Sequence, residues 1–221
     1  MSDGNSRWVT SNQQGPHPDV AKVVARHLAH PNQKPVNEHT LQAFEQAGEW
    51  LADWQGDLIL DACCGIGEST HRLAKLNPNA RVIGIDKSAH RLDKHTGHFG
   101  EAPDNALLLR ADVGDFWRLA QQANWQISQH YLLYPNPYPK KSQLQKRWHG
   151  HPAFVDLVAL GGQLTVRSNW QTYIQEFADA LQCLQVKSDI SEYRDDEAFT
   201  PFERKYWASG QSSWQLLANL S

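Results

Sequence analysis

From residue 57 onward the sequence alternates between short apolar runs and helical patterns, and this alternation limits the possible folds more than any other feature. The runs lie at residues 58–62, 81–85, 106–109, 131–134, 163–166, 186–190 and 214–217. Apolar strands separated by helices form parallel sheets that are covered on both faces. A stretch almost without helical pattern precedes the last run, which favours a closing antiparallel hairpin. We therefore predict an α/β fold: a doubly wound, seven-stranded, mostly parallel sheet with helices on both faces and an antiparallel last strand.

Two further helical patterns precede the first strand, one opening at Asp19 and one following Asn37. A chain of 221 residues fits one domain. We expect that domain over residues 19–221, with N-terminal helices in 19–55 and the core in 56–221. Residues 1–18 are polar, contain Pro16 and Pro18, and are predicted to form a flexible arm.

Composition argues against several classes of protein. The chain is 40% hydrophobic and 20% charged, which is typical of globular domains. It has no apolar run near the roughly 20 residues that span a bilayer, and no signal-peptide pattern at its start. Three cysteines make no disulfide framework, and none has a partner cluster with zinc spacing. We expect a cytoplasmic protein with no membrane partner and no metal, and we interpret Cys63 and Cys64 as small loop residues.

Acidic residues stand at the ends of the first three predicted strands: Asp61, Asp86 and Asp112. In open α/β sheets the ligand binds at the carboxyl ends of the strands. Each acid alone is as consistent with a helix cap as with a ligand contact. Together they indicate a bound nucleoside.

The turn after the first strand contains Gly65 and Gly67, which allow the backbone to approach a ligand closely. Thr70 stands where the dinucleotide fingerprint needs a third glycine, so a pyrophosphate site is not expected. S-adenosylmethionine has a ribose, an adenine and a charged tail but no phosphate. We expect Asp86 to accept hydrogen bonds from the ribose hydroxyls and Asp112 to accept one from the adenine amino group. Asp61 should lie near the ammonium group of the tail.

Over about residues 56–190 these features resemble the class I S-adenosylmethionine-dependent methyltransferases. The resemblance implies a Rossmann-like fold, S-adenosylmethionine as cofactor and S-adenosylhomocysteine as product. The residues expected to bind the cofactor are Asp61, Cys64, Gly65, Gly67, Asp86, Asp112, Val113 and Asn136.

The segment between Asp115 and Asp156 contains no acidic residue, but it holds five Lys or Arg residues together with Tyr and Trp. This pattern suits phosphates and stacked bases, and a solvated helix face is its alternative explanation. The formal net charge of the whole chain is −3, so the basic character is local.

Residues 134–141 read Tyr-Pro-Asn-Pro-Tyr-Pro-Lys-Lys, and residues 200–203 read Thr-Pro-Phe-Glu. The first stretch resembles the Pro-Asp-Pro-Trp-Pro-Lys motif of the bacterial tRNA (guanine-N7-)-methyltransferases. The second is similar to the Thr-x-Phe-Glu segment of that family. The resemblance implies transfer of a methyl group to guanine N7 in the variable loop of tRNA, by a monomer or homodimer that binds RNA.

By this resemblance Asn136 is the catalytic residue, lying between cofactor and base, and Glu203 accepts from the guanine N1–H and amino group. The residues expected to bind substrate are Lys140, Lys141, Arg147, Asn169, Thr200, Phe202 and Glu203.

Two positions depart from the family pattern. Asn136 and Asn169 stand where the family has Asp, and Asn169 is also well placed to cap a helix beginning at Trp170. Two alternatives therefore stay open. One is an amino methyltransferase acting on adenine N6 or a glutamine amide, and the other is a catalytically weak tRNA-binding homologue.

Overall fold

Seven strands form one sheet in the order β3-β2-β1-β4-β5-β7-β6. The computed structural model describes residues 5–94 and 103–220. The strands are β1 (Leu58–Ala62), β2 (Arg81–Asp86), β3 (Ala106–Arg110), β4 (Gln129–Leu133), β5 (Gln163–Ser168), β6 (Ser188–Tyr193) and β7 (Ser213–Asn219). The pairs among β1 to β5 are parallel, whereas β7 runs antiparallel to both β5 and β6. The predicted fold class is confirmed.

Helices connect these strands. They are α1 (Val20–Ala29), α2 (Glu38–Leu51), α3 (Glu68–Leu76), α4 (Ala89–Leu92), α6 (Val113–Gln122), α7 (Phe154–Ala159), α8 (Gln171–Cys183) and α9 (Pro201–Ala208), with 3-10 helices η1 (Lys141–Lys146) and η2 (Trp148–Gly150). The sequence pattern also predicts a helix over residues 89–98. It begins as expected at Ala89, but residues 95–98 lie outside the described part of the chain. The prediction of an almost helix-free stretch before the last strand is wrong, because α9 occupies it.

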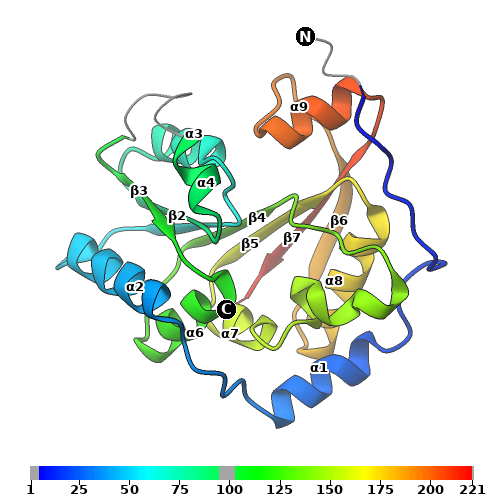
Figure 1. Ribbon diagram of the computed structural model, residues 1–221, viewed down its shortest axis with the longest axis horizontal. Coiled ribbons are helices and arrows are strands. Elements are labelled where there is room, and N and C mark those ends of the chain that lie inside the picture. Colours follow the sequence, from blue (N-terminus) through cyan, green and yellow to red (C-terminus); the bar gives the residue numbers. More distant parts are fainter. Residues whose placement is uncertain (1–4, 95–102, 221) are drawn as a thin grey trace.

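The apolar core is divided between the two faces of the sheet. The larger cluster includes side chains of α1, α2, α6, α7 and α8, and the smaller one packs α3 against Ile59 and Val82. Figure 1 shows the first group of helices on one side of the strands and α3, α4 and α9 on the other. Beneath α9, Arg167 of β5 donates hydrogen bonds to Gln215 of β7 and to Glu203 of α9.

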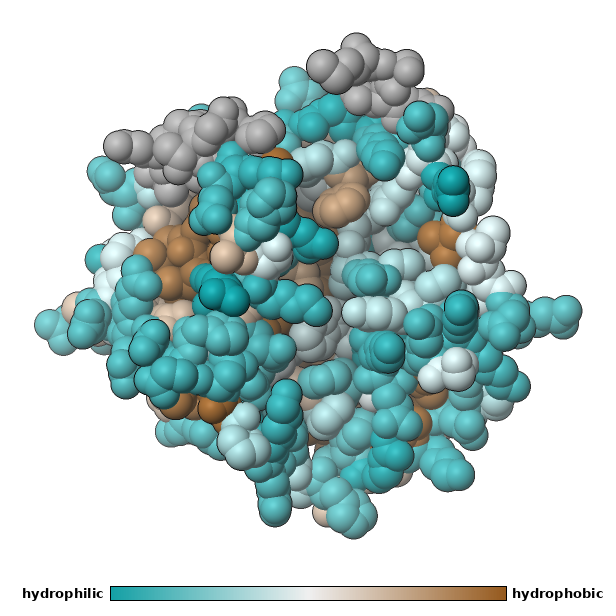
Figure 2. Space-filling model, viewed as in Figure 1, coloured by the Kyte–Doolittle hydropathy of each residue, from teal (hydrophilic) through white to brown (hydrophobic). Residues whose placement is uncertain are grey.

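The strand order changes direction between β1 and β4, whose carboxyl ends are Ala62 and Leu133. Loops leaving these two strands diverge, and such a point is where open α/β sheets bind ligands. In Figure 2 a hollow lies between the part of the surface formed by α3 and α4 and the part formed by α9. The topology therefore predicts ligand binding at the loops after β1, β2 and β4.

Residues 5–18 contain no helix or strand, but hydrogen bonds join them to the body of the protein. The backbone N–H of Ser6 donates to Ser209 Oγ at 2.9 Å, and Ser11 Oγ donates to the Pro139 carbonyl at 2.5 Å. The sequence predicts a free arm here, whereas the structure gives a bound segment. The reason is that its partners lie more than 100 residues away in the chain.

No helix in residues 5–94 or 103–220 is long and apolar enough to cross a membrane.

Gly84 of β2 lies where Thr70 of α3 packs close against the sheet. A Cβ at this position would stand 2.2 Å from Thr70 Oγ1 and 2.7 Å from Leu108 Cδ2. We expect Gly84→Ala to lower the free energy of unfolding by about 1–3 kcal/mol, as overpacking of a core does. Chemical denaturation would measure it. Gly48→Ala on the exposed side of α2 is the control and should be neutral or stabilising, because nothing lies within 4 Å of its added Cβ. Equal effects of the two substitutions would contradict the close approach.

Candidate functional site

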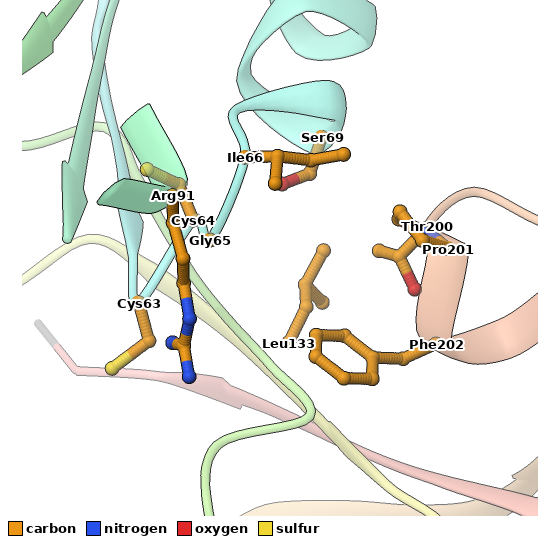
Figure 3. Close-up of a pocket in the computed structure, with 10 residues that line it drawn as sticks. All are labelled: Cys63, Cys64, Gly65, Ile66, Ser69, Arg91, Leu133, Thr200, Pro201 and Phe202. Carbon is orange, nitrogen blue, oxygen red and sulfur yellow. The ribbon is translucent and has the colours of Figure 1, made fainter. Parts of the chain in front are cut away.

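A pocket lies at the carboxyl ends of β1 and β4, between the loop after β1 and the start of α9 (Figure 3). Its lining residues are Cys63, Cys64, Gly65, Ile66, Ser69, Arg91, Leu133, Thr200, Pro201 and Phe202. The pocket thus brings together Cys64 and Gly65, predicted to bind cofactor, and Thr200 and Phe202, predicted to bind substrate. These two groups are more than 130 residues apart in sequence.

The wall formed by the loop after β1 depends on left-handed backbone. Gly65 and Gly67 have φ values of +64° and +82°, a region in which glycine is favoured. Cys63 also has a positive φ, 62°. Gly67 is the N-cap of α3, so the turn directs the start of this helix toward the pocket. The loop thereby presents backbone, with little side-chain bulk, to a ligand.

Asp61 lies behind this wall with its side chain buried. Ser69 Oγ and Thr70 Oγ1 each donate to Asp61 Oδ2 at 2.6 Å. The other carboxylate oxygen, Oδ1, is buried without a hydrogen-bond partner among the described residues. Burial raises the pKa of this carboxyl to about 6, although the two hydroxyl donors lower it in part. An unmatched buried acceptor of this kind is suited to a cationic group that reaches it past Ser69.

Asp86 ends β2 and also holds the loop after β1. Its Oδ2 accepts the Gly65 N–H at 3.0 Å, and its Oδ1 accepts the Ser88 N–H at 2.8 Å. The Arg91 guanidinium stands 3.4 Å from the same Oδ2 and points into the pocket (Figure 3). Each carboxylate oxygen can accept more than one hydrogen bond. The position fits a ribose contact once the half-exposed Arg91 side chain moves aside.

Asp112 caps α6: its Oδ1 accepts the Asp115 N–H at 3.1 Å. The Asp112 N–H in turn donates to Thr40 Oγ1 at 3.0 Å, and the neighbouring Val113 is buried. Neither residue lines the pocket. The cap explains the position of Asp112 without a ligand, and a contact with adenine remains a prediction.

The two adjacent thiols are protonated at neutral pH. Burial raises the pKa of Cys63 to about 12 and raises that of Cys64 well above its ordinary value, and the nearby Asp86 and Asp61 add to both shifts. Neither is therefore an activated nucleophile. In the described ranges, 5–94 and 103–220, no cluster of His, Cys, Asp or Glu has the geometry of a metal site.

Asn136 lies on an exposed loop two residues after Tyr134, and it does not line the pocket. Its Oδ1 accepts the Tyr138 N–H at 3.2 Å, which closes a tight turn. Tyr134 and Tyr138 both have positive φ, 51° and 43°. The loop therefore has a strained, fixed backbone. The side-chain carbonyl of Asn136 is occupied by a hydrogen bond within the loop.

The structure contradicts the prediction that Arg147 binds substrate. Its side chain is 0% exposed and forms an ion pair with Glu176 of α8. It also donates to the carbonyls of Tyr138 and Lys140, at 3.1 and 3.2 Å. An arginine pointing inward beneath the loop cannot reach a phosphate. By contrast Lys140 and Lys141 are exposed, and their contact with substrate remains a prediction.

The prediction that Glu203 recognises guanine is also contradicted. The residue is 0% exposed. Its Oε2 accepts the N–H groups of Phe199 and Thr200, and its Oε1 accepts from Arg167 at 3.0 Å. Thr200 Oγ1 accepts the Glu203 N–H at 3.1 Å, so the two residues form a capping box at the start of α9. The Thr-Pro-Phe-Glu segment builds the helix end, and Phe202, 40% exposed, faces the pocket.

Asn169 does not cap α8, which was the predicted alternative role. The N-cap is Trp170, and Ser168 Oγ accepts the Trp170 N–H at 3.1 Å. Asn169 Nδ2 instead donates to Gln211 Oε1 at 2.9 Å, just beyond α9. The side chain is partly exposed, and its contact with substrate remains a prediction.

Six of the lining residues are not predicted from the sequence: Cys63, Ile66, Ser69, Arg91, Leu133 and Pro201. Ser69 could have been found, because a hydroxyl at the start of a helix after a glycine turn faces the ligand end of the sheet. Arg91 gives no such signal, since it lies on a four-residue helix whose pattern is too short to orient it.

A family model described as "Putative methyltransferase" matches residues 55–216. The match covers more than half of the chain and includes both walls of the pocket. The chain belongs to this family. It is therefore an S-adenosylmethionine-dependent methyltransferase, as the glycine turn and the strand-end acids predict.

This methyltransferase is also similar to curated proteins named tRNA (guanine-N(7)-)-methyltransferase. The protein of Alkaliphilus oremlandii is 23% identical over 81% of this chain and 89% of its own length. The Nocardioides protein is 26% identical over 79% and 73%. The Aquifex aeolicus protein is 24% identical over 69% of this chain, and the match spans only 53% of that protein.

Solved structures share the fold of the methyltransferase at low identity. The 16S rRNA methyltransferase KamB superposes with a TM-score of 0.60 at 19% identity, over 86% of this chain and 98% of its own. A structure titled "antibiotic related Methyltransferase" gives 0.58 at 13%, over 84% and 96%.

The buried carboxyl of Asp61 should make stability depend on pH. Its folded pKa of about 6 exceeds the value of 3.8 expected when unfolded, so the folded state binds the proton more tightly. Stability is therefore lost as pH rises from about 4 to 6, by on the order of 3 kcal/mol. Asp61→Asn does not ionise and should escape this loss, so its melting temperature relative to wild type should increase between pH 5 and 7.5.

Thermal unfolding of the ligand-free protein measures this difference. Glu45→Gln, at an exposed position of α2, is the control and should show a constant difference. A constant difference for Asp61→Asn as well would contradict the raised pKa.

Proposed function

We propose that this methyltransferase modifies N7 of a guanine in tRNA. The observation that carries the proposal is the chemistry of the pocket wall. None of its ten residues is a carboxylate or a histidine, and its two thiols are protonated. Such a wall offers no general base. Guanine N7 carries a lone pair and no proton, so it is an acceptor that needs none. The names of the curated relatives support the same choice.

In this proposal, one wall of the pocket holds the cofactor and the opposite wall holds the base. The glycine turn, with Asp61 behind it and Asp86 beside it, would hold S-adenosylmethionine. That cofactor supplies an electrophilic methyl group on a sulfonium and leaves as S-adenosylhomocysteine. In this proposal Cys64, Asp112 and Val113 complete the cofactor side. Asp61 and Asp86 would offset the positive charge of the bound molecule.

The opposite wall would hold the base. Phe202 is exposed toward the pocket and stands 6.1 Å, centroid to centroid, from Tyr206, while Tyr134 lies 5.5 Å from Tyr206. An aromatic group of this kind suits a purine that is unstacked from RNA. Catalysis would then consist of positioning, with the base fixed so that N7 faces the methyl group.

The alternative acceptors fit the geometry less well. Adenine N6 and a glutamine amide carry protons that must leave. Asn136 lies outside the pocket wall, and its carbonyl oxygen accepts the Tyr138 N–H. This placement bears equally on the role implied for Asn136 in N7 transfer, so the lack of a base in the pocket wall is what distinguishes the acceptors.

Labelled methyl transfer to unmodified tRNA tests the proposal directly. We expect label in 7-methylguanosine, and strand cleavage at that nucleotide after borohydride and aniline treatment. Asp86→Asn, checked for folding, is the matched inactive variant, because it weakens the acceptor for the cofactor ribose. Label in methyladenosine or in protein would refute the assignment, and so would tight cofactor binding without any incorporation.

We refer to residues 134–141, which contain three prolines, as the proline loop. Lys140 and Lys141 end this loop and are both exposed, so they should contact the RNA backbone. Their joint replacement by alanine should weaken tRNA binding and reduce the slope of log K against log salt by about two units. Binding measured from low to moderate salt gives this slope. Replacing the exposed Lys22 and Lys75 by alanine is the charge-matched control. An unchanged slope for the first pair would place the phosphates elsewhere.

A further inference from the structure

The segment before α1 runs along the protein from α9 to α1 (Figure 1, dark blue). It makes hydrogen bonds to the rest of the protein at three places: the end of α9, the loop at residues 134–141 and the Arg147–Glu176 ion pair. We refer to residues 6–17 as the strap. Nothing in the family motifs or in the proposed chemistry gives this segment a role.

The first attachment is at the end of α9. The Ser6 N–H donates to Ser209 Oγ at 2.9 Å, and the Ser6 carbonyl accepts from Gln211 Nε2 at 2.9 Å. Gln211 also accepts from Asn169, just after β5. The strap therefore joins the helix that carries Phe202 to the carboxyl end of a central strand.

The second attachment is at the proline loop. Ser11 Oγ donates to the Pro139 carbonyl at 2.5 Å, and Asn12 Oδ1 accepts the Lys141 N–H at 2.9 Å. These two bonds lie on either side of Lys140. They fix the backbone that presents both predicted RNA-binding lysines.

The third attachment is to a buried ion pair. Gln13 Nε2 donates to Glu176 Oε1 at 2.5 Å, and Gln13 Oε1 accepts from Arg147 Nη2 at 3.1 Å. The backbone N–H of His17 adds a bond to Glu176 Oε1 at 2.8 Å. Both charged side chains are 0% exposed, and buried charges require their remaining hydrogen bonds to be made.

Gln13 thus completes a chain of contacts that ends at the loop. Arg147 holds the carbonyls of Tyr138 and Lys140, and Gln13 holds Arg147 and its carboxylate partner together. Loss of the glutamine would leave Glu176 Oε1 with the His17 N–H alone and Arg147 Nη2 with the Lys140 carbonyl alone, and the arginine would be less firmly placed under the loop.

We propose that the strap positions the substrate-side wall, and that Gln13 is its central positioning residue. The strap holds the proline loop and α9 in one arrangement. The cofactor wall is built by β1, β2 and α3, and the Glu68–Arg204 ion pair joins α3 to α9. The binding of RNA at this wall rests on the proposed function. The positioning of the wall by the strap does not depend on that function.

Hydrogen–deuterium exchange on the full chain tests the physical part. In Gln13→Ala, peptides covering residues 137–147 should exchange at least several-fold faster, and peptides from β1 to β2 should be unchanged. Gln13→Met fills similar volume without the hydrogen bonds and should behave like Gln13→Ala. Gln14→Ala, at the exposed neighbouring position, is the matched control and should behave like wild type.

Binding and kinetics with the same variants test the consequence. Gln13→Ala should raise the KM for tRNA roughly tenfold, which is the scale of one strong hydrogen bond, while the Kd for S-adenosylmethionine stays within about twofold. A uniform loss of stability would change both.

The exchange and methylation experiments test the strap and the proposed function separately. Unchanged exchange in residues 137–147 overturns the strap, and so does a Gln13→Met variant that behaves like wild type. Faster exchange with no methylation of tRNA by any variant keeps the strap and overturns the proposed function.

Discussion

The substrate side of this methyltransferase depends on one buried carboxylate, that of Glu176. It accepts from Arg147, His149 and Gln13 and from the His17 backbone, so it joins α8, the two 3-10 helices and the strap at one point. Burial alone would raise the pKa of Glu176, but the hydrogen bonds and the charge of its partners lower it to about 2. The carboxylate therefore stays ionised at any physiological pH.

Two other buried carboxylates also hold separate elements together, in this case at the pocket. Asp86 ties the glycine turn to β2, and Glu203 ties α9 to Arg167 of β5. In each case an acid that a motif marks for ligand binding also satisfies backbone N–H groups of its own loop. The geometry of both pocket walls is thus set by charged side chains that are withdrawn from solvent, which makes it stiff but sensitive to their loss.

The sequence is sufficient to predict the strands, the glycine turn and the acids at the strand ends. Apolar periodicity reports which side chains are removed from water, and β1 is apolar at every position except Asp61. The same reasoning fails for Arg147 and Glu203, because burial of a charge depends on partners that are 29 and 36 residues away. A basic run and a Thr-x-x-Glu motif look alike whether they face RNA or the interior. The strap is harder still to foresee, since its partners lie as far as 205 residues along the chain.

The placement of these charges bears on how the proposed reaction would proceed. Positive charge passes from the sulfonium to the guanine ring during transfer. On the acceptor side Glu203 is buried and paired, and Asn136 and Asn169 are amides at positions where the motif pattern that they resemble has acids. These three positions therefore provide no free carboxylate to stabilise the developing charge, and Lys140 and Lys141 are exposed a few residues after Asn136. Rate enhancement must then come mainly from alignment, while a cationic product is held weakly and released readily. An enzyme of this kind depends on rigid positioning of its acceptor wall, which is what the buried Glu176 network and the strap provide.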